Sequence, residues 1–119
     1  MAKILMVDDE QEICDLMKGY LEAKGYEVVI SNNCRDTIPA LKKENPAIML
    51  LDWRLPDGDG IDLLQSIREF NPTVKVIMIS AYDMSNEDMK RIQSLSVLKY
   101  MRKPILVDDL KEILKKISS

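Results

Sequence analysis

The sequence has no histidine and only two cysteines among its 119 residues. The lack of histidine removes Ser-His and Cys-His nucleophile pairs and the commonest ligand of transition metals. The two cysteines, Cys14 and Cys34, fall in predicted helices without metal-site spacing, so we expect reduced thiols in a reducing compartment. These absences exclude hydrolase triads and histidine-based zinc sites, and they favour the cytoplasm.

The sequence also lacks any apolar run near the roughly 18 residues that a membrane-spanning helix requires. Its first residues show no signal-type segment, so we expect no export. Acidic residues outnumber basic ones by 20 to 17, whereas binding to nucleic acids usually depends on a clustered basic surface. We therefore expect one globular domain, 1–119, that binds neither membranes nor nucleic acids directly.

Five short segments have the residue pattern of β-strands. Segments 4–7, 47–51 and 74–79 are nearly continuous apolar runs, which is typical of strands covered on both faces of a parallel sheet. Segments 27–31 and 98–102 contain more polar residues, as expected for strands nearer the edges of a sheet. The sequence therefore predicts three central strands and two outer ones.

Four segments between or after these strands have apolar residues at helical spacing: 13–21, 61–67, 89–95 and 110–117. A further helix is predicted to end at Asn45-Pro46, and Pro39 inside it should bend or shorten it. Lys24-Gly25 is a stop signal for the first helix, and Ser85 with Asp88 resembles a capping box. Helices therefore alternate with strands along the chain.

Strict alternation of strands and helices implies right-handed crossovers and a parallel sheet with helices on both faces. For five such units a common strand order is 2-1-3-4-5, in which a crevice opens at the carboxyl ends of the first and third strands. We therefore predict an α/β fold: a doubly wound five-stranded parallel sheet in a flavodoxin-like three-layer sandwich, with the functional site at that crevice.

Polar residues follow the predicted strands: Asp8 and Asp9 the first, Asp52 the third, Ser80 the fourth and Lys103 the fifth. Neighbouring strands lie about 4.8 Å apart, so these side chains should meet at one edge of the sheet. Three close carboxylates repel one another unless a cation lies among them, and oxygen ligands favour Mg²⁺. Mg²⁺, a lysine and a hydroxyl together suit a phosphoryl group, with Asp52 as the central candidate for the nucleophile.

Simpler roles are available for several of these residues. Asp9 has capping-box spacing with Glu12 and could cap the first helix as well as bind a metal. Asp57 and Asp59 alternate with glycines and are expected to form a turn and a helix cap. Asp52 closes an apolar strand with no helix to cap, and this position favours a functional role.

Four motifs in this order resemble those of response-regulator receiver domains: Val-Asp-Asp-Glu at 7–10, Leu-Asp-Trp-Arg-Leu-Pro-Asp-Gly-Asp-Gly at 51–60, Ser80-Ala81 and Lys103-Pro104. The resemblance covers the whole chain. It implies a phosphoacceptor module of a two-component phosphorelay, with no separate substrate. The implied partners are a sensor histidine kinase or phosphotransfer protein and a downstream protein or effector domain. Phosphorylation-dependent dimerisation stays open.

The resemblance also implies roles for the residues of the crevice. Asp52 would accept the phosphoryl group. Asp9, Asp52 and the carbonyl of Arg54 would bind Mg²⁺ directly, while Asp8 would assist through water. Lys103 would contact the phosphoryl group, and the Lys103-Pro104 peptide bond would be cis.

A second set of implied roles concerns switching and the lifetime of the phosphorylated form. Ser80 would shift toward the phosphoryl group and Tyr100 would turn inward. Arg54 and Tyr82 would flank the path of the hydrolytic water and slow dephosphorylation. The sequence departs from the family at Ser96-Val97, where receivers commonly have Gly-Ala, and this change should stiffen a loop coupled to the switch.

Three alternatives are weighed against this interpretation. A phosphatase with an aspartate nucleophile would need Asp-x-Asp, whereas the chain has Asp52-Trp53-Arg54. A flavin-binding module would need a phosphate loop after the first strand, where the acidic segment 8–10 would repel phosphate. A receiver-like domain that only docks and is never phosphorylated is disfavoured because every charged group for the chemistry is present.

Overall fold

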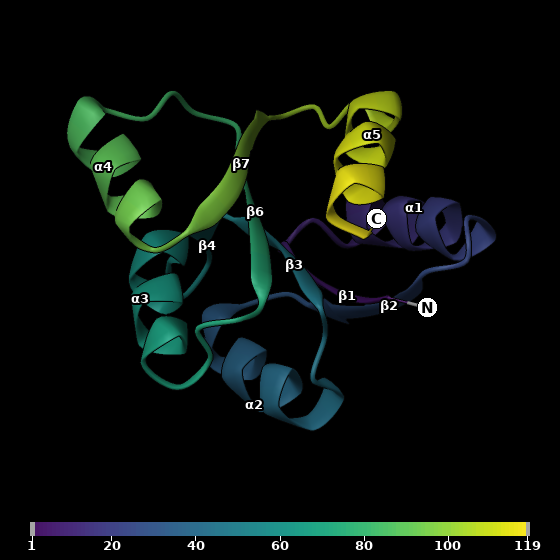
Figure 1. Cartoon of the computed structure of the whole chain (residues 1–119), viewed down its shortest axis with the longest axis horizontal. Helices are drawn as coiled ribbons and strands as arrows, with labels where there is room; N and C mark the ends of the chain where they lie inside the picture. Colours follow the sequence, from purple (N-terminus) through teal and green to yellow (C-terminus); the bar gives the residue numbers. More distant parts are fainter. Residues whose placement is uncertain (1, 119) are drawn as a thin grey trace.

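The computed structural model describes residues 2–118, which form one five-stranded parallel sheet and a short two-stranded ribbon. The strands of the sheet lie in the order β2-β1-β3-β6-β7, as Figure 1 shows. Their bounds are β1 (Lys3–Val7), β2 (Glu27–Ser31), β3 (Ile48–Asp52), β6 (Lys75–Ser80) and β7 (Val97–Arg102). This arrangement confirms the predicted order 2-1-3-4-5.

Five helices connect or follow these strands and cover both faces of the sheet (Figure 1). They are α1 (Gln11–Ala23), α2 (Cys34–Glu44), α3 (Gly60–Phe70), α4 (Asn86–Ser94) and α5 (Val107–Ser118). Buried residues of α1 and α5 pack on one face, and those of α2, α3 and α4 pack on the other. The predicted three-layer sandwich is therefore confirmed. Within residues 2–118, every helix is too short or too polar to cross a bilayer.

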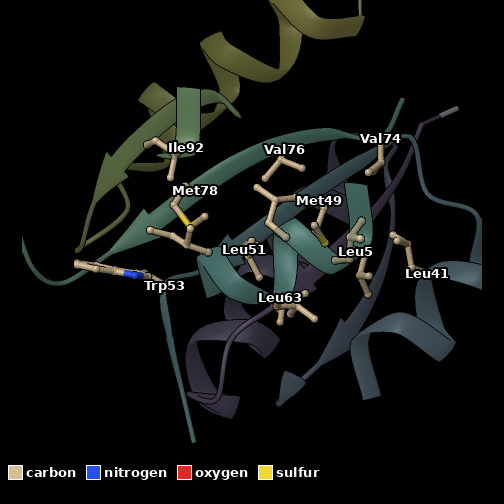
Figure 2. Packing of buried hydrophobic residues seen from close by; sticks show 14 of the residues in the cluster. Leu5, Leu41, Met49, Leu51, Trp53, Leu63, Val74, Val76, Met78 and Ile92 are labelled. Carbon is tan, nitrogen blue, oxygen red and sulfur yellow. The ribbon is translucent and has the colours of Figure 1, made fainter. Parts of the chain in front are cut away.

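The core is divided into two clusters because successive residues of a strand point to opposite faces of the sheet. In β1, Ile4 and Met6 pack toward α1 and α5, while Leu5 and Val7 pack toward the other three helices. Figure 2 shows the second of these clusters, with Trp53 and Leu41 at opposite ends. Burial on both faces is the physical reason for the nearly continuous apolar runs in the sequence.

The predicted helix ends agree with the structure at most positions. Gly25 has φ 98° after the last turn of α1, and Asn45 ends α2 with φ 46°, which is the left-handed region. Ser85 and Asp88 form the predicted capping box of α4. Asp59 caps α3 by accepting hydrogen bonds from two backbone N–H groups of the first turn, as predicted.

Two of the alternatives given for the helices, a cap by Asp9 and a shortening by Pro39, are contradicted by the structure. Asp9 does not cap α1, because the N-cap position is occupied by Glu10 and no side chain accepts a capping hydrogen bond there. Pro39 does not shorten α2, which continues to Glu44. The rest of α2 is held by its left-handed end and by packing of Leu41 in the core, so the loss of one backbone hydrogen bond is tolerated.

A short antiparallel ribbon was not predicted. It pairs β4 (Arg54–Leu55) with β5 (Gly58–Asp59), directly after β3. At its turn, the carboxylate of Asp57 accepts hydrogen bonds from the first two backbone N–H groups of α2, at 2.7 and 3.0 Å. Strands of two residues are too short to produce an alternating pattern in the sequence.

Candidate functional site

The carboxyl edge of the sheet gathers the acidic residues that the sequence placed after β1 and β3. Asp8 and Asp9 follow β1, Asp52 ends β3, and the two strands are direct neighbours. Each of the three carboxylates offers an oxygen, and these oxygens all lie within 4.8 Å of one another. Asp8 and Asp52 are buried, whereas Asp9 is exposed to solvent. The structure therefore brings the three predicted carboxylates together.

The ammonium group of Lys103 contacts these acids from the opposite side of the crevice. Its Nζ atom is 3.0 Å from Oδ2 of Asp52 and 3.0 Å from Oδ2 of Asp8. A third carboxylate, that of Glu10, approaches to 2.8 Å. Lys103 follows β7 directly, and its peptide bond to Pro104 is cis, as the resemblance implied.

Burial and charge shift the proton affinities of this cluster. Burial of Asp52, together with the nearby charge of Asp8, raises the pKa of the Asp52 carboxyl, although Lys103 and a backbone hydrogen bond from Arg54 oppose the shift. Burial alone would lower the pKa of Lys103, but hydrogen bonds to Glu10, Asp52 and Asp8 raise it above its ordinary value. Lys103 therefore stays charged, and the site has more negative charge than one ammonium group neutralises.

The carboxylate of Asp8 tests whether this site suits a metal ion. Asp8 is 1% exposed, and its Oδ1 accepts a hydrogen bond from the backbone N–H of Glu10 at 2.9 Å. Its Oδ2 is buried and lies 3.0 Å from Nζ of Lys103, which also pairs with the carboxylates of Glu10 and Asp52. One ammonium group cannot neutralise three carboxylates, and buried negative charge is costly unless further cationic charge lies beside it. Oxygen donors of this kind fit Mg²⁺.

The segment after Asp52 is held tightly against the start of α3. A side chain at Gly60 would place its Cβ atom 2.4 Å from the backbone oxygen of Asp52, so this contact requires glycine. The N–H of Gly60 also donates to the carbonyl of Trp53 at 2.6 Å. The indole N–H of Trp53 donates to Asp59 at 3.1 Å. These contacts fix the backbone that carries the Asp52 carboxylate.

Ser80 lies on the strand beside Asp52, but its hydroxyl group bonds elsewhere. Its Oγ accepts from the backbone N–H of Tyr82 and donates to the carbonyl of the same residue, both at 2.9 Å. The hydroxyl of Tyr100 donates to that carbonyl at 2.6 Å. Tyr100 is half-buried against the core cluster of α3 and α4. The two residues are therefore linked through Tyr82, and neither contacts Asp52 by a hydrogen bond in the described structure.

Arg54 and Tyr82 lie beside the same crevice. The guanidinium carbon of Arg54 is 4.3 Å from the centre of the Trp53 ring and 6.0 Å from that of the Tyr82 ring. Tyr82 is 60% exposed, so its ring lies at the surface. The sequence placed the two side chains two residues beyond Asp52 and Ser80, and the structure puts the guanidinium group of Arg54 over the Trp53 ring with the Tyr82 ring farther away.

Glu10 is a contact of the site that the sequence interpretation left without a role. The only sequence signal for a role of Glu10 in the site was its place in the segment 7–10. An acidic residue directly after two site carboxylates lies close to any cation that they bind. Lys103 is 93 residues away along the chain, so the pairing could not be read from local spacing.

Comparison with known proteins agrees with the geometry of the site. Residues 4–115 match the family described as response regulator receiver domain. Sporulation initiation phosphotransferase F of Bacillus subtilis (strain 168) is 31% identical over 117 residues, which cover 96% of this chain and 91% of that protein. Other curated relatives are longer, and this chain spans 24–25% of the length of transcriptional regulatory proteins named ZraR.

Solved structures resemble the chain over nearly its whole length. A CheY-like response regulator receiver domain protein from Methanospirillum hungatei JF-1 superposes with a TM-score of 0.90 at 32% identity, covering 99% of this chain and 94% of that one. The response regulator TrrA from Thermotoga maritima, solved in complex with Mg²⁺-BeF, has a TM-score of 0.84 at 30% identity and covers 98% of this chain and 99% of its own.

Proposed function

Because this chain belongs to the response-regulator receiver domains, the phosphoacceptor modules of two-component phosphorelays, we propose that Asp52 is the residue that becomes phosphorylated. The observation that carries this proposal is the position of Asp52 between the acid cluster and the ammonium group of Lys103. Membership of the family also decides against the phosphatase and the flavin-binding alternatives.

The acid cluster is the proposed place of a magnesium ion. Asp9, Asp52 and the carbonyl of Arg54 would hold the ion directly, and the buried Asp8 would act through water. Support comes from the three clustered carboxylates, whose charge exceeds that of the one ammonium group beside them, and from the Mg²⁺ bound in the similar regulator TrrA. A bound Mg²⁺ would offset the negative charge of the acids and of an incoming phosphoryl group.

In the proposed reaction, the Asp52 carboxylate attacks the phosphorus of a phosphohistidine on a sensor kinase or phosphotransfer protein. The oxygen–phosphorus bond forms as the nitrogen–phosphorus bond breaks, and the imidazole of the donor leaves. Lys103 already contacts Asp52 at 3.0 Å and would pair with an oxygen of the transferred group. The chain contributes position and charge, and it turns over no separate substrate.

We assign the switch to Ser80 and Tyr100. To reach the phosphoryl group, Ser80 would exchange its hydrogen bonds with Tyr82 for one with a phosphoryl oxygen. The N–H of Tyr82 would then lose its acceptor, and Tyr100 would break its own hydrogen bond with the Tyr82 carbonyl as it turns inward. Arg54 and Tyr82, both at the rim of the crevice, would restrict the approach of the water that hydrolyses the acyl phosphate.

Two-component partners follow from the family. We propose a histidine kinase or phosphotransfer protein as donor, and a downstream protein or effector domain as target. We place this exchange in the cytoplasm, supported by the free cysteines and the lack of a membrane-crossing helix among residues 2–118.

Intact-mass measurement tests the phosphoacceptor. After incubation with acetyl phosphate and Mg²⁺, we expect the parent chain to gain one phosphoryl group and Asp52→Asn to gain none. Asp83→Asn is the matched control, because Asp83 is an exposed carboxylate in the loop after β6 and should be labelled like the parent. Labelling of Asp52→Asn at the parent level would remove Asp52 as the acceptor.

A further inference from the structure

The carboxylate of Glu10 makes the shortest of the three ionic contacts of Lys103, and none of the steps above uses it. Oε1 of Glu10 lies 2.8 Å from Nζ, whereas Asp8 and Asp52 are each 3.0 Å away. Glu10 is the N-cap residue of α1, yet its side chain does not cap the helix. Its side chain is instead directed to a residue on the other side of the crevice.

The three partners of Lys103 differ in burial. The side chains of Asp8 and Asp52 are 1% and 7% exposed, whereas that of Glu10 is 51% exposed. Glu10 therefore contacts the ammonium group from the solvent side, and the two aspartates contact it from inside the site. The oxygens on the inner side are Oδ2 of Asp8 and Oδ2 of Asp52, in the cluster that can hold a metal.

We propose that Glu10 is a positioning residue that draws Lys103 toward the mouth of the crevice when a divalent cation occupies the acid cluster. This inference rests on the proposed function. Two cations held among the same carboxylates repel each other strongly in a partly buried site. Lys103 must therefore withdraw from Asp8 and Asp52, and Glu10 supplies a partner for the ammonium group on the outer side.

A general effect of charge is the rival explanation. A carboxylate near the crevice attracts any cation through space, whether or not it contacts Lys103. The two explanations differ in what they require of the side chains. Positioning acts only through Lys103 and needs the full length of the Glu10 side chain, whereas attraction through space needs only a negative charge.

The test is a Mg²⁺ titration followed by the fluorescence of Trp53. This residue is the single tryptophan of the chain, is 6% exposed and directly follows Asp52. We expect Glu10→Gln to weaken Mg²⁺ binding by roughly three- to thirtyfold in the parent and by less than about twofold in a Lys103→Gln background. Glu10→Asp keeps the charge but is one methylene shorter, and it should weaken binding nearly as much as Glu10→Gln.

Glu12→Gln is the matched control. Glu12 is an exposed acid in the first turn of α1, two residues from Glu10, and its loss should leave Mg²⁺ binding within about twofold of the parent. Equal losses for Glu10→Gln in the two backgrounds, or parent-like binding by Glu10→Asp, would overturn the positioning role. A parent chain that binds Mg²⁺ and gains a phosphoryl group while Glu10→Gln binds equally well would overturn this inference alone. A parent chain without any response to Mg²⁺ would overturn the proposed metal site as well.

Discussion

The hydroxyl groups of Ser80 and Tyr100 share one acceptor, the backbone carbonyl of Tyr82. Ser80 is fully buried on the strand next to Asp52, and Tyr100 is half-buried on the neighbouring strand. Ser80 also accepts a hydrogen bond from the N–H of Tyr82, so its departure would release that N–H and leave the carbonyl to the hydroxyl of Tyr100. A change at Asp52 can therefore reach Tyr100 through two intervening residues, Ser80 and Tyr82.

Replacement of Ser80 by alanine tests this connection. In the parent, we expect phosphorylation to increase hydrogen exchange of the Tyr82 amide. Ser80→Ala should still accept a phosphoryl group but should lose this increase. The variant should also be less stable by about 1 kcal/mol, because a buried hydrogen-bonded hydroxyl is removed. Hydrogen exchange with and without acetyl phosphate measures the first effect, and urea unfolding the second. A phosphorylation-dependent increase that persists in Ser80→Ala would break the proposed link.

The position of Arg54 beside Tyr82 predicts a slower loss of the phosphoryl group. We expect Arg54→Ala and Tyr82→Ala to shorten the lifetime of the phosphorylated chain by roughly two- to fivefold, the kinetic equivalent of one exposed cation–π contact. The control is Lys42→Ala, which removes a similar contact with Phe70 on α2 and α3. Lifetimes equal to that of the parent would dismiss the shielding role.

The raised pKa of Asp52 predicts a particular dependence of stability on pH. Because burial and Asp8 raise its pKa in the folded state, ionised Asp52 destabilises the fold at neutral pH, and this cost is relieved as the pH falls through the folded pKa toward 3.8. The stability of Asp52→Asn relative to the parent should therefore be highest at about pH 7 and decrease toward about pH 4. Urea unfolding of the two chains without Mg²⁺ measures this difference in stability at each pH.

Asp57 supplies a control of opposite sign. Hydrogen bonds from the backbone N–H groups of Cys34 and Arg35 lower its pKa, so ionised Asp57 stabilises the fold above its unfolded pKa. The advantage of the parent over Asp57→Asn should decrease as the pH falls. If both variants changed in the same direction, the assigned pKa shifts would be wrong.

Arg68 joins the ends of α3 and α4 through backbone oxygens. Its guanidinium group donates to the carbonyls of Leu95, Asn71, Val74 and Ser96. We expect Arg68→Met to lower the free energy of unfolding by about 1.5–3 kcal/mol, because several partly buried carbonyls lose a charged donor. The measurement is urea unfolding.

Arg91 provides the comparison, since it also connects α4 to α3 but does so at the surface. Its ion pair with Asp62 has a separation of 2.7 Å, with side chains 43% and 69% exposed. Arg91→Met should therefore cost less than about 1 kcal/mol. Equal costs for the two arginine variants would contradict the distinction between buried and exposed partners.

Ser96 has φ 60° in the connection between α4 and β7, a backbone region that favours glycine. Serine in this region is strained, so Ser96→Gly should raise the free energy of unfolding by about 0.5–1 kcal/mol. Ser66→Gly, at a helical position of α3, should lower it by a similar amount. A loss of stability in Ser96→Gly would show that the serine side chain contributes more than its backbone strain costs.

Much of this fold could be predicted from local patterns. The strand predicted at 47–51 is observed as Ile48–Asp52, and that at 27–31 matches β2. Such segments are recognisable because burial on both faces of a sheet demands apolar residues within a few positions of one another. The short ribbon after β3 was missed because strands of two residues are too short to show a periodic pattern.

The alternation of strands and helices in the sequence predicted the sandwich and its strand order. The residues that follow the strands predicted that Asp8, Asp9, Asp52 and Lys103 meet at one edge of the sheet. Only the tertiary structure decided that Glu10 pairs with Lys103 and that Ser80 bonds with Tyr82. The physical reason is that side-chain partners in a crevice are chosen by distance and burial among segments far apart in the chain, and local spacing does not contain that information.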